Sequence, residues 1–91
     1  MILEIVTPEM TIFSGEVESV SVPGVNGQFQ MLDNHAPVVS LLTKGAVKIF
    51  GNIQLDEAVA ARFTKVDGTT DFQITGGVLE MTDNKAIVLA D

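Results

Sequence analysis

The groups in this 91-residue sequence that could do acid–base or metal chemistry are one histidine and a scatter of carboxylates. His35 is the only histidine, so a metal site with several histidine ligands cannot form. As a general base, His35 would need a positioned nucleophile and an orienting carboxylate. Asp33 lies two residues away, but nothing else in the sequence converges on this pair. We interpret His35 as a turn or contact residue, and a small hydrolase centred on it stays an alternative.

The remaining candidate groups also favour structural roles. The neighbouring carboxylates Glu16 and Glu18, and Asp56 and Glu57, show no sign of the burial that would make one an acid and the other a base. Neither glycine pattern that cradles phosphate, G-x-x-x-x-G-K-[ST] or G-x-G-x-x-G, occurs in the sequence. We therefore predict no catalytic residue, no metal site and no cofactor, and hence a protein that is not an enzyme.

Charge and composition exclude several classes of partner. Five basic and twelve acidic residues give a formal net charge of −7 and a pI near 4.3, which repels the phosphates of nucleic acids and anionic lipids. No apolar run approaches the roughly 18 residues that a spanning helix needs. We predict no nucleic-acid partner and no direct membrane insertion, so that any membrane association goes through another protein.

The elements that must position these residues are short strands. Segments rich in Val, Ile and Phe end at Gly, Pro, Asn or Asp, and residues such as Val47 and Ile49 alternate with polar neighbours, which is typical of antiparallel strands with one buried face. No repeat or linker divides the sequence, so we predict one all-β domain, 1–91, with a sandwich architecture. Turns are expected where residues tolerate a positive φ: at Pro23-Gly24, Asn26-Gly27, Asp67-Gly68, Gly76-Gly77 and Asp83-Asn84.

Two segments fit this pattern less well. Val17 has the opposite parity to Val20 and Val22, which indicates a bulge or a second buried face. Residues 52–61 suit either a strand or a helix, because helical spacing runs through Asp56 to Phe63. We predict a short helix or an irregular excursion over 52–61, followed by a strand from Arg62 to Val66.

Several blocks of the sequence together resemble the epsilon subunits of bacterial ATP synthases. The resemblance covers most of the chain, and the blocks come in the order and spacing of that family. They are Leu3-Glu4-Ile5-Val6-Thr7-Pro8-Glu9, Phe13-Ser14-Gly15-Glu16-Val17-Glu18, the run from Gly27 to Pro37 (GQFQMLDNHAP), Thr75-Gly76-Gly77-Val78-Leu79-Glu80 and Ile87-Val88-Leu89-Ala90-Asp91.

The resemblance implies a flattened antiparallel β-sandwich of about ten short strands at the foot of the central stalk. By position in the family's pattern, contacts with the gamma subunit are expected at Thr7, His35 and Ser40. Contacts with the ring of c subunits are expected at Asn26, Gly27, Gln28 and Phe29. Many relatives carry a carboxylate where Gln28 stands, so a charge-assisted contact with the ring is expected to be weaker here.

The function implied is that of a non-catalytic stalk subunit in a proton-translocating ATP synthase, which links gamma to the c-ring so that rotation is coupled to ATP synthesis. The subunit would lie on the cytoplasmic face of the bacterial inner membrane, held there by the complex. Longer relatives continue beyond the position of Asp91 into a two-helix hairpin, so the resemblance is to the short form. The alternative from another class is an independent β-sandwich ligand-binding or adaptor module, which would need a concave pocket with convergent polar groups.

Overall fold

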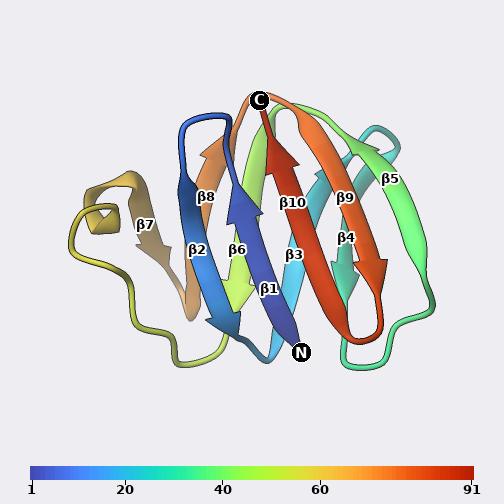
Figure 1. The fold of residues 1–91 in the computed structure, drawn as a ribbon, viewed down its shortest axis with the longest axis horizontal. Helices are drawn as coiled ribbons and strands as arrows, with labels where there is room; N and C mark the ends of the chain where they lie inside the picture. Colours follow the sequence, from blue (N-terminus) through green and yellow to red (C-terminus); the bar gives the residue numbers. More distant parts are fainter.

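The computed structural model describes residues 1–91 and contains ten strands and one short 3₁₀ helix (Figure 1). The strands are short, as the close spacing of turn residues predicts. In chain order the elements are β1 (Ile2–Val6), β2 (Thr11–Glu16), β3 (Ser19–Gly24), β4 (Gly27–Met31), β5 (Val38–Leu42), β6 (Gly45–Phe50), η1 (Ala60–Arg62), β7 (Phe63–Val66), β8 (Thr69–Ile74), β9 (Gly77–Thr82) and β10 (Lys85–Ala90).

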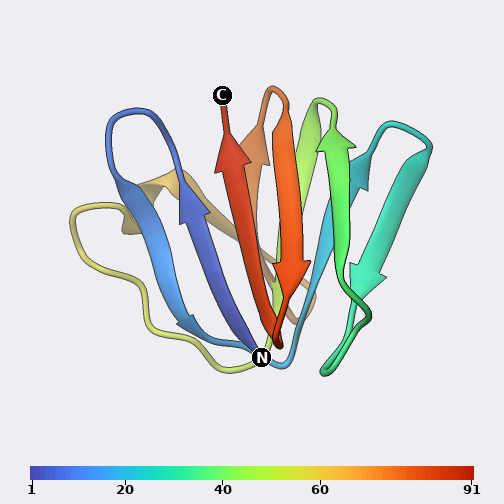
Figure 2. The ribbon, with the colours of Figure 1, turned by 45° about the vertical axis from the view of Figure 1, so that its right-hand side comes forward.

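The strands form two layers that meet at one corner. The first layer has the order β2-β1-β10-β9-β5, and the second has the order β4-β3-β6-β8-β7. The layers join where Gly24 of β3 pairs with Leu42 of β5. Figures 1 and 2 show β5 close to the β3–β4 hairpin on one side of the sandwich. The predicted ten-stranded β-sandwich is confirmed, with β1 and β10 as its one parallel pair.

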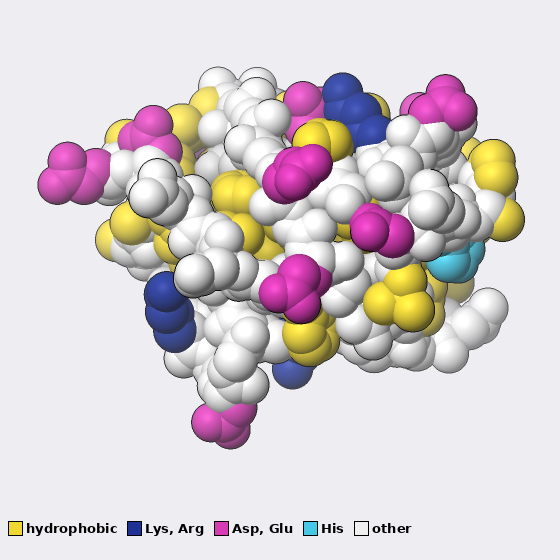
Figure 3. All heavy atoms as spheres, turned by 90° about the horizontal axis from the view of Figure 1, so that it is seen from below, with side chains coloured by type: hydrophobic (Ala, Val, Ile, Leu, Met, Phe, Trp, Pro, Cys, Tyr) yellow, Lys and Arg dark blue, Asp and Glu magenta, His cyan; other side chains and the backbone are white.

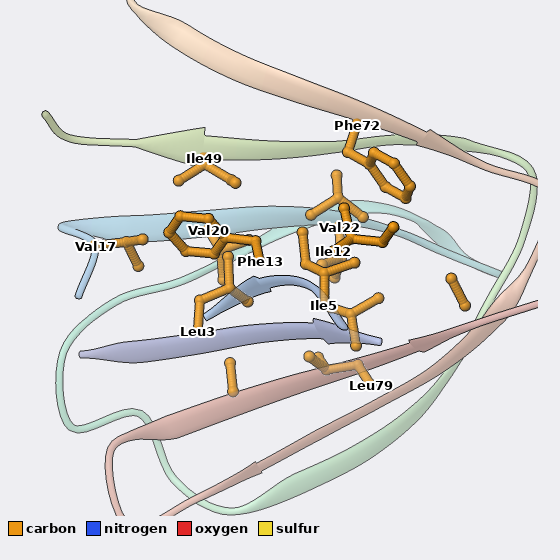
Figure 4. Packing of buried hydrophobic residues seen from close by; sticks show 14 of the residues in the cluster. Leu3, Ile5, Ile12, Phe13, Val17, Val20, Val22, Ile49, Phe72 and Leu79 are labelled. Atoms are coloured by element: carbon orange, nitrogen blue, oxygen red, sulfur yellow. The ribbon is translucent and has the colours of Figure 1, made fainter. Parts of the chain in front are cut away.

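The hydrophobic core lies between the two layers. In strands such as β1 and β10, every second side chain points inward. Core residues such as Leu3, Ile5 and Leu79 are completely buried (Figure 4). Val17 is also buried, at 7% exposure, although it lies between β2 and β3 and not within a strand. The change of parity noted in the sequence therefore comes from this connection, which resets the alternation between two strands of different layers.

Three of the predicted turns close hairpins. Asp67 and Gly68 join β7 to β8, and Asp83 and Asn84 join β9 to β10, all four with positive φ, as two-residue hairpins require. The β3–β4 turn occupies Val25 and Asn26, followed by Gly27 at φ +119°. The prediction of a turn at Pro23-Gly24 was wrong: both residues lie in β3, and Gly24 still pairs with Gly27 across the hairpin.

Gly76 and Gly77 connect the two layers. β8 belongs to the second layer and β9 to the first, so this connection is a corner and not a tight hairpin. Both glycines have positive φ, +159° and +155°. A side chain on Gly77 would overlap the carbonyl oxygen of Leu89 on the neighbouring strand β10. Glycine is needed here because β10 passes close to the backbone where the chain changes layer.

The segment that the sequence left ambiguous is an irregular excursion with one turn of 3₁₀ helix. The chain has no regular structure from Asn52 to Asp56, and η1 covers only Ala60–Arg62. Val59, 2% exposed, anchors the segment in the core. The strand resumes at Phe63 and not at Arg62 as predicted, because Arg62 still belongs to the 3₁₀ turn. Phe63 pairs with Phe72 of β8, with ring centroids 5.2 Å apart.

Candidate functional site

Two of the predicted gamma contacts lie at opposite ends of the first layer. Thr7 follows the last residue of β1, whereas His35 precedes β5. These two strands run in the same direction, because β5 and β10 are each antiparallel to β9 and β10 is parallel to β1. The His35 end, which carries scattered acidic side chains with the histidine at its rim, faces the viewer in Figure 3. A single small partner site cannot include both residues.

Ser40 lies beside the loop predicted to face the c-ring. A depression of about 260 Å³ is lined by Ser40 of β5 and by the β3–β4 turn region, including Asn26, Gly27, Gln28 and Phe29. The structure thus brings one predicted gamma residue together with all four predicted ring residues. The depression lies at the corner where β3 and β5 meet. The predicted contacts with gamma and with the c-ring would therefore lie next to each other there.

Gln28 is turned toward its own sheet. Its side-chain amide donates to the Ser21 hydroxyl at 3.0 Å and to the Ala46 carbonyl at 3.1 Å. Gln30, two residues later on the same side of β4, donates to the Ser19 hydroxyl at 2.8 Å. These bonds tie β4 across β3, so Gln28 holds the hairpin that carries the turn at Val25 and Asn26.

We expect Gln28→Ala to lower the free energy of unfolding by about 1 kcal/mol, because two exposed or half-buried hydrogen bonds are lost. Amide hydrogens of β4 should exchange faster, since β4 lies at the edge of its layer. Gln54→Ala, an exposed glutamine without such bonds, is the control. Equal melting temperatures and equal β4 exchange for both variants would show that these bonds do not hold the hairpin.

Thr7 and His35 make local contacts only. The Thr7 hydroxyl donates to the Met10 carbonyl at 3.1 Å and accepts from the Met10 N–H at 3.3 Å, which closes the β1–β2 loop. The exposed His35 ring contacts the carbonyl oxygen of its neighbour Ala36 at 2.7 Å. No nucleophile or carboxylate is hydrogen-bonded to this ring, and Asp33 is engaged with the amino group of Met1. The arrangement that a hydrolase at His35 would require is therefore not formed.

Five depressions of the surface have volumes between about 230 and 390 Å³, at the low end for small-molecule sites. Every buried side-chain nitrogen or oxygen has a hydrogen-bond partner within the chain. No group of three or more His, Asp or Glu side chains comes together as a metal site. The geometry gives no support to an independent ligand-binding module.

The outer surface of the first layer carries an apolar stripe that the sequence-based prediction missed. Cross-strand pairing aligns Leu41 of β5, Val78 of β9, Leu89 of β10 and Val6 of β1 in one row. The adjacent row contains Val39 and Ile87 with Glu80 between them. Leu41 is 64% exposed and Val39 71%. We call the six hydrophobic residues the outer apolar face: Val6, Val39, Leu41, Val78, Ile87 and Leu89.

The outer surface of the second layer is polar by contrast. Its rows bring together the side chains of β4, β3, β6 and β8. Lys48 and Asp71 face each other with 3.9 Å between Nζ and Oδ2, and Thr69 donates to Asp71 at 2.6 Å. The glutamine–serine bonds described above join further polar side chains of this surface to one another. A contiguous exposed apolar surface is typical of an interaction site, which makes the outer surface of the first layer the candidate docking face.

A sequence signal for the outer apolar face does exist. Val38-Val39, Leu41-Leu42 and Ile87-Val88-Leu89 are apolar at both parities, the pattern of strands covered on both sides. Only the register shows that their outward residues lie side by side, since that depends on which strands pair. Across the whole structure, no helix has the length and apolar character needed to cross a membrane.

Comparison with known proteins identifies clear relatives. The family model described as "ATP synthase, Delta/Epsilon chain, beta-sandwich domain" matches residues 1–91. The ATP synthase epsilon chain of Chlorobaculum tepidum is 39% identical over 89 residues, which cover 98% of this chain and 86% of that one. The epsilon chain of Campylobacter fetus is 42% identical over 90 residues, but the match covers only 59% of its length.

Solved structures share the fold at low sequence identity. The central stalk and c-ring structure of the mitochondrial ATP synthase from Tetrahymena thermophila contains a chain that superposes with a TM-score of 0.74 at 16% identity, over 98% of this chain and 61% of that one. A chain of the Euglena gracilis mitochondrial ATP synthase gives 0.73 at 18% identity, over 99% of this chain and 49% of that one. These chains carry the same sandwich and additional residues beyond it.

Proposed function

Because the chain belongs to the family of ATP synthase delta/epsilon β-sandwich domains, we propose that it is a non-catalytic central-stalk subunit that links the gamma subunit to the c-ring. The observation that carries this proposal is the match of the family model to all 91 residues. Residues 1–91 would act as one rigid domain.

The gamma subunit would pack along the first layer. Thr7 and His35 stand at opposite ends of this layer, so a partner that touches both must run along its strands, over about 17 Å for five residues. The outer apolar face lies between these two ends, whereas Ser40 pairs with the buried Leu79 and therefore lies on the other side of β5, beside the β3–β4 turn. A partner packed on this face would bury exposed leucine and valine side chains, which is the main driving force for association.

The c-ring would contact the β3–β4 turn. This turn lies at the same end as Thr7, because Gly24 beside it pairs with Leu42 at the last residue of β5. Asn26 and Gly27 form the exposed tip, and Gln28 holds it against the second layer. Two contacts in different places on one stiff sandwich would let this subunit transmit torque from ring to gamma. The subunit would then sit peripherally at the cytoplasmic face of the bacterial inner membrane, through the complex alone.

Reconstitution of the enzyme with and without this chain tests the function. We expect a tagged chain to retain gamma when the two are co-expressed. ATP-driven proton pumping by enzyme in vesicles should require the chain, because without it the ring is not locked to gamma. Neither ATP hydrolysis by the isolated chain nor retention of gamma by an unrelated β-sandwich of similar charge is expected. Full pumping without the chain would overturn the linking role.

A further inference from the structure

Glu80 is the one charged side chain inside the outer apolar face that has no partner. It stands on β9, directly opposite Val39 of β5 on one side and Ile87 of β10 on the other. Its carboxylate is exposed and makes no ion pair or hydrogen bond within the chain. The next carboxylate along the same row, Glu4, is satisfied by Lys85 at 3.5 Å and by the Ser14 hydroxyl at 3.4 Å.

A partner that covers the outer apolar face must compensate the negative charge of Glu80. Apolar neighbours lie on both adjacent strands, so a partner that buries Val39 and Ile87 also removes water from the carboxylate between them. A carboxylate buried without a donor opposes association strongly, whereas a basic side chain placed opposite it offsets that loss. Lys85, the one basic residue of β10, pairs with Glu4 and not with Glu80.

We propose that Glu80 determines the specificity of docking by pairing with a lysine or arginine side chain of the stalk partner that covers the outer apolar face. This inference rests on the proposed function and adds the chemistry of the partner surface: an apolar centre with one basic group opposite β9. The net charge of −7 makes a basic partner surface favourable at longer range as well.

Two substitutions distinguish a specific ion pair between Glu80 and the partner from a role of Glu80 as a charge that only keeps the surface soluble. Glu80→Gln keeps the shape and removes the charge. Glu80→Leu extends the apolar face, which fits the leucine and valine residues around it. If the partner presents a basic group, both variants leave that group buried without its counter-charge, and both bind more weakly. If the partner presents only apolar surface, Glu80→Leu binds more tightly than the parent.

The experiment measures affinity for purified gamma subunit from the same enzyme, at low and high salt. We expect both Glu80 variants to lose roughly tenfold or more in affinity and to show a weaker dependence on salt than the parent. Glu57→Gln is the matched control, because it also removes one exposed carboxylate but lies in the excursion before β7. Circular dichroism and the melting temperature of each variant serve to check that the fold is unchanged.

The outcomes separate this inference from the function on which it rests. If the parent chain binds gamma and Glu80→Leu binds equally or more tightly, the pairing is wrong while the stalk function stands. If the Glu57 control loses as much affinity as Glu80→Gln, general charge and not a specific pair is responsible. If the parent does not bind gamma, the proposed function itself fails.

Discussion

Replacing Gly77 with alanine is expected to destabilise the domain by about 3 kcal/mol or more. The new Cβ would overlap the carbonyl oxygen of Leu89 and lie 3.1 Å from the Cα of Ala90. Both atoms belong to the backbone of β10, which pairs with β9 and with β1, so neither can move without disturbing the centre of the first layer. The melting temperature should fall by roughly 15 °C, given the size of the chain.

Gly76→Ala provides the matched control for this prediction. Gly76 has nearly the same φ, +159° against +155°, so both substitutions carry a similar backbone strain. The Cβ at Gly76, however, would meet the carboxylate of Asp91 at 2.9 Å and no backbone atom closer than 3.5 Å, and a flexible exposed side chain can rotate away. Gly76→Ala should therefore be clearly milder. Equal melting temperatures for the two variants would show that the approach of β10 is not what requires glycine.

These two glycines illustrate what local sequence can and cannot predict about the fold. The hairpin turns at Asp67-Gly68 and Asp83-Asn84 were predictable, because the residues that tolerate positive φ are also those that close two-residue loops. The Gly76-Gly77 pair gave the same local signal but serves as a corner between layers. Whether two consecutive strands pair with each other or separate into different layers depends on long-range contacts, which residue types at the connection do not report.

Register limits the prediction of the candidate site in the same way. Thr7, His35, Ser40 and the run from Asn26 to Phe29 came from resemblance alone, and the structure places Ser40 beside that run while it separates Thr7 from His35. The resemblance did not indicate the outer apolar face, and the apolar runs at both parities did not show that its residues lie side by side. Leu41 and Leu89 are 48 positions apart in the sequence, and they become neighbours of Val78 only through two strand pairings.

The excursion over 51–62 shows how tertiary structure decides between competing local patterns. Its apolar residues suited a helix from Asp56 to Phe63, but only Val59 is fully buried within 52–61. Phe63 must start an extended strand to pair with Phe72. The Asp56 carboxylate accepts from the Ala58 N–H at 2.9 Å, a local bond that favours a turn over a continuing helix. One helical turn is therefore all that forms.

The contrast between the two outer surfaces predicts that one charge placed on each will have very different consequences. We expect Leu41→Asp to reduce affinity for gamma by about 100-fold or more. The substitution removes a leucine from the outer apolar face, worth about 2 kcal/mol when buried, and adds a carboxylate that the partner would bury without a donor. Because Leu41 is 64% exposed in the free domain, the fold itself should lose little stability.

Gln73→Asp introduces the same side chain on the polar outer surface of the second layer. Gln73 is an exposed residue of β8 opposite Ala46 of β6, and aspartate is generally unfavourable in strands. The melting temperature of each variant measures its cost to the fold, so that a loss of docking can be told apart from a loss of stability. In enzyme reconstituted into vesicles, Leu41→Asp should abolish ATP-driven proton pumping at chain concentrations that saturate the parent, whereas Gln73→Asp should pump normally. If Gln73→Asp is the variant that fails to bind gamma, the partner packs on the second layer, and the hydrophobic residues exposed on the first layer serve another contact.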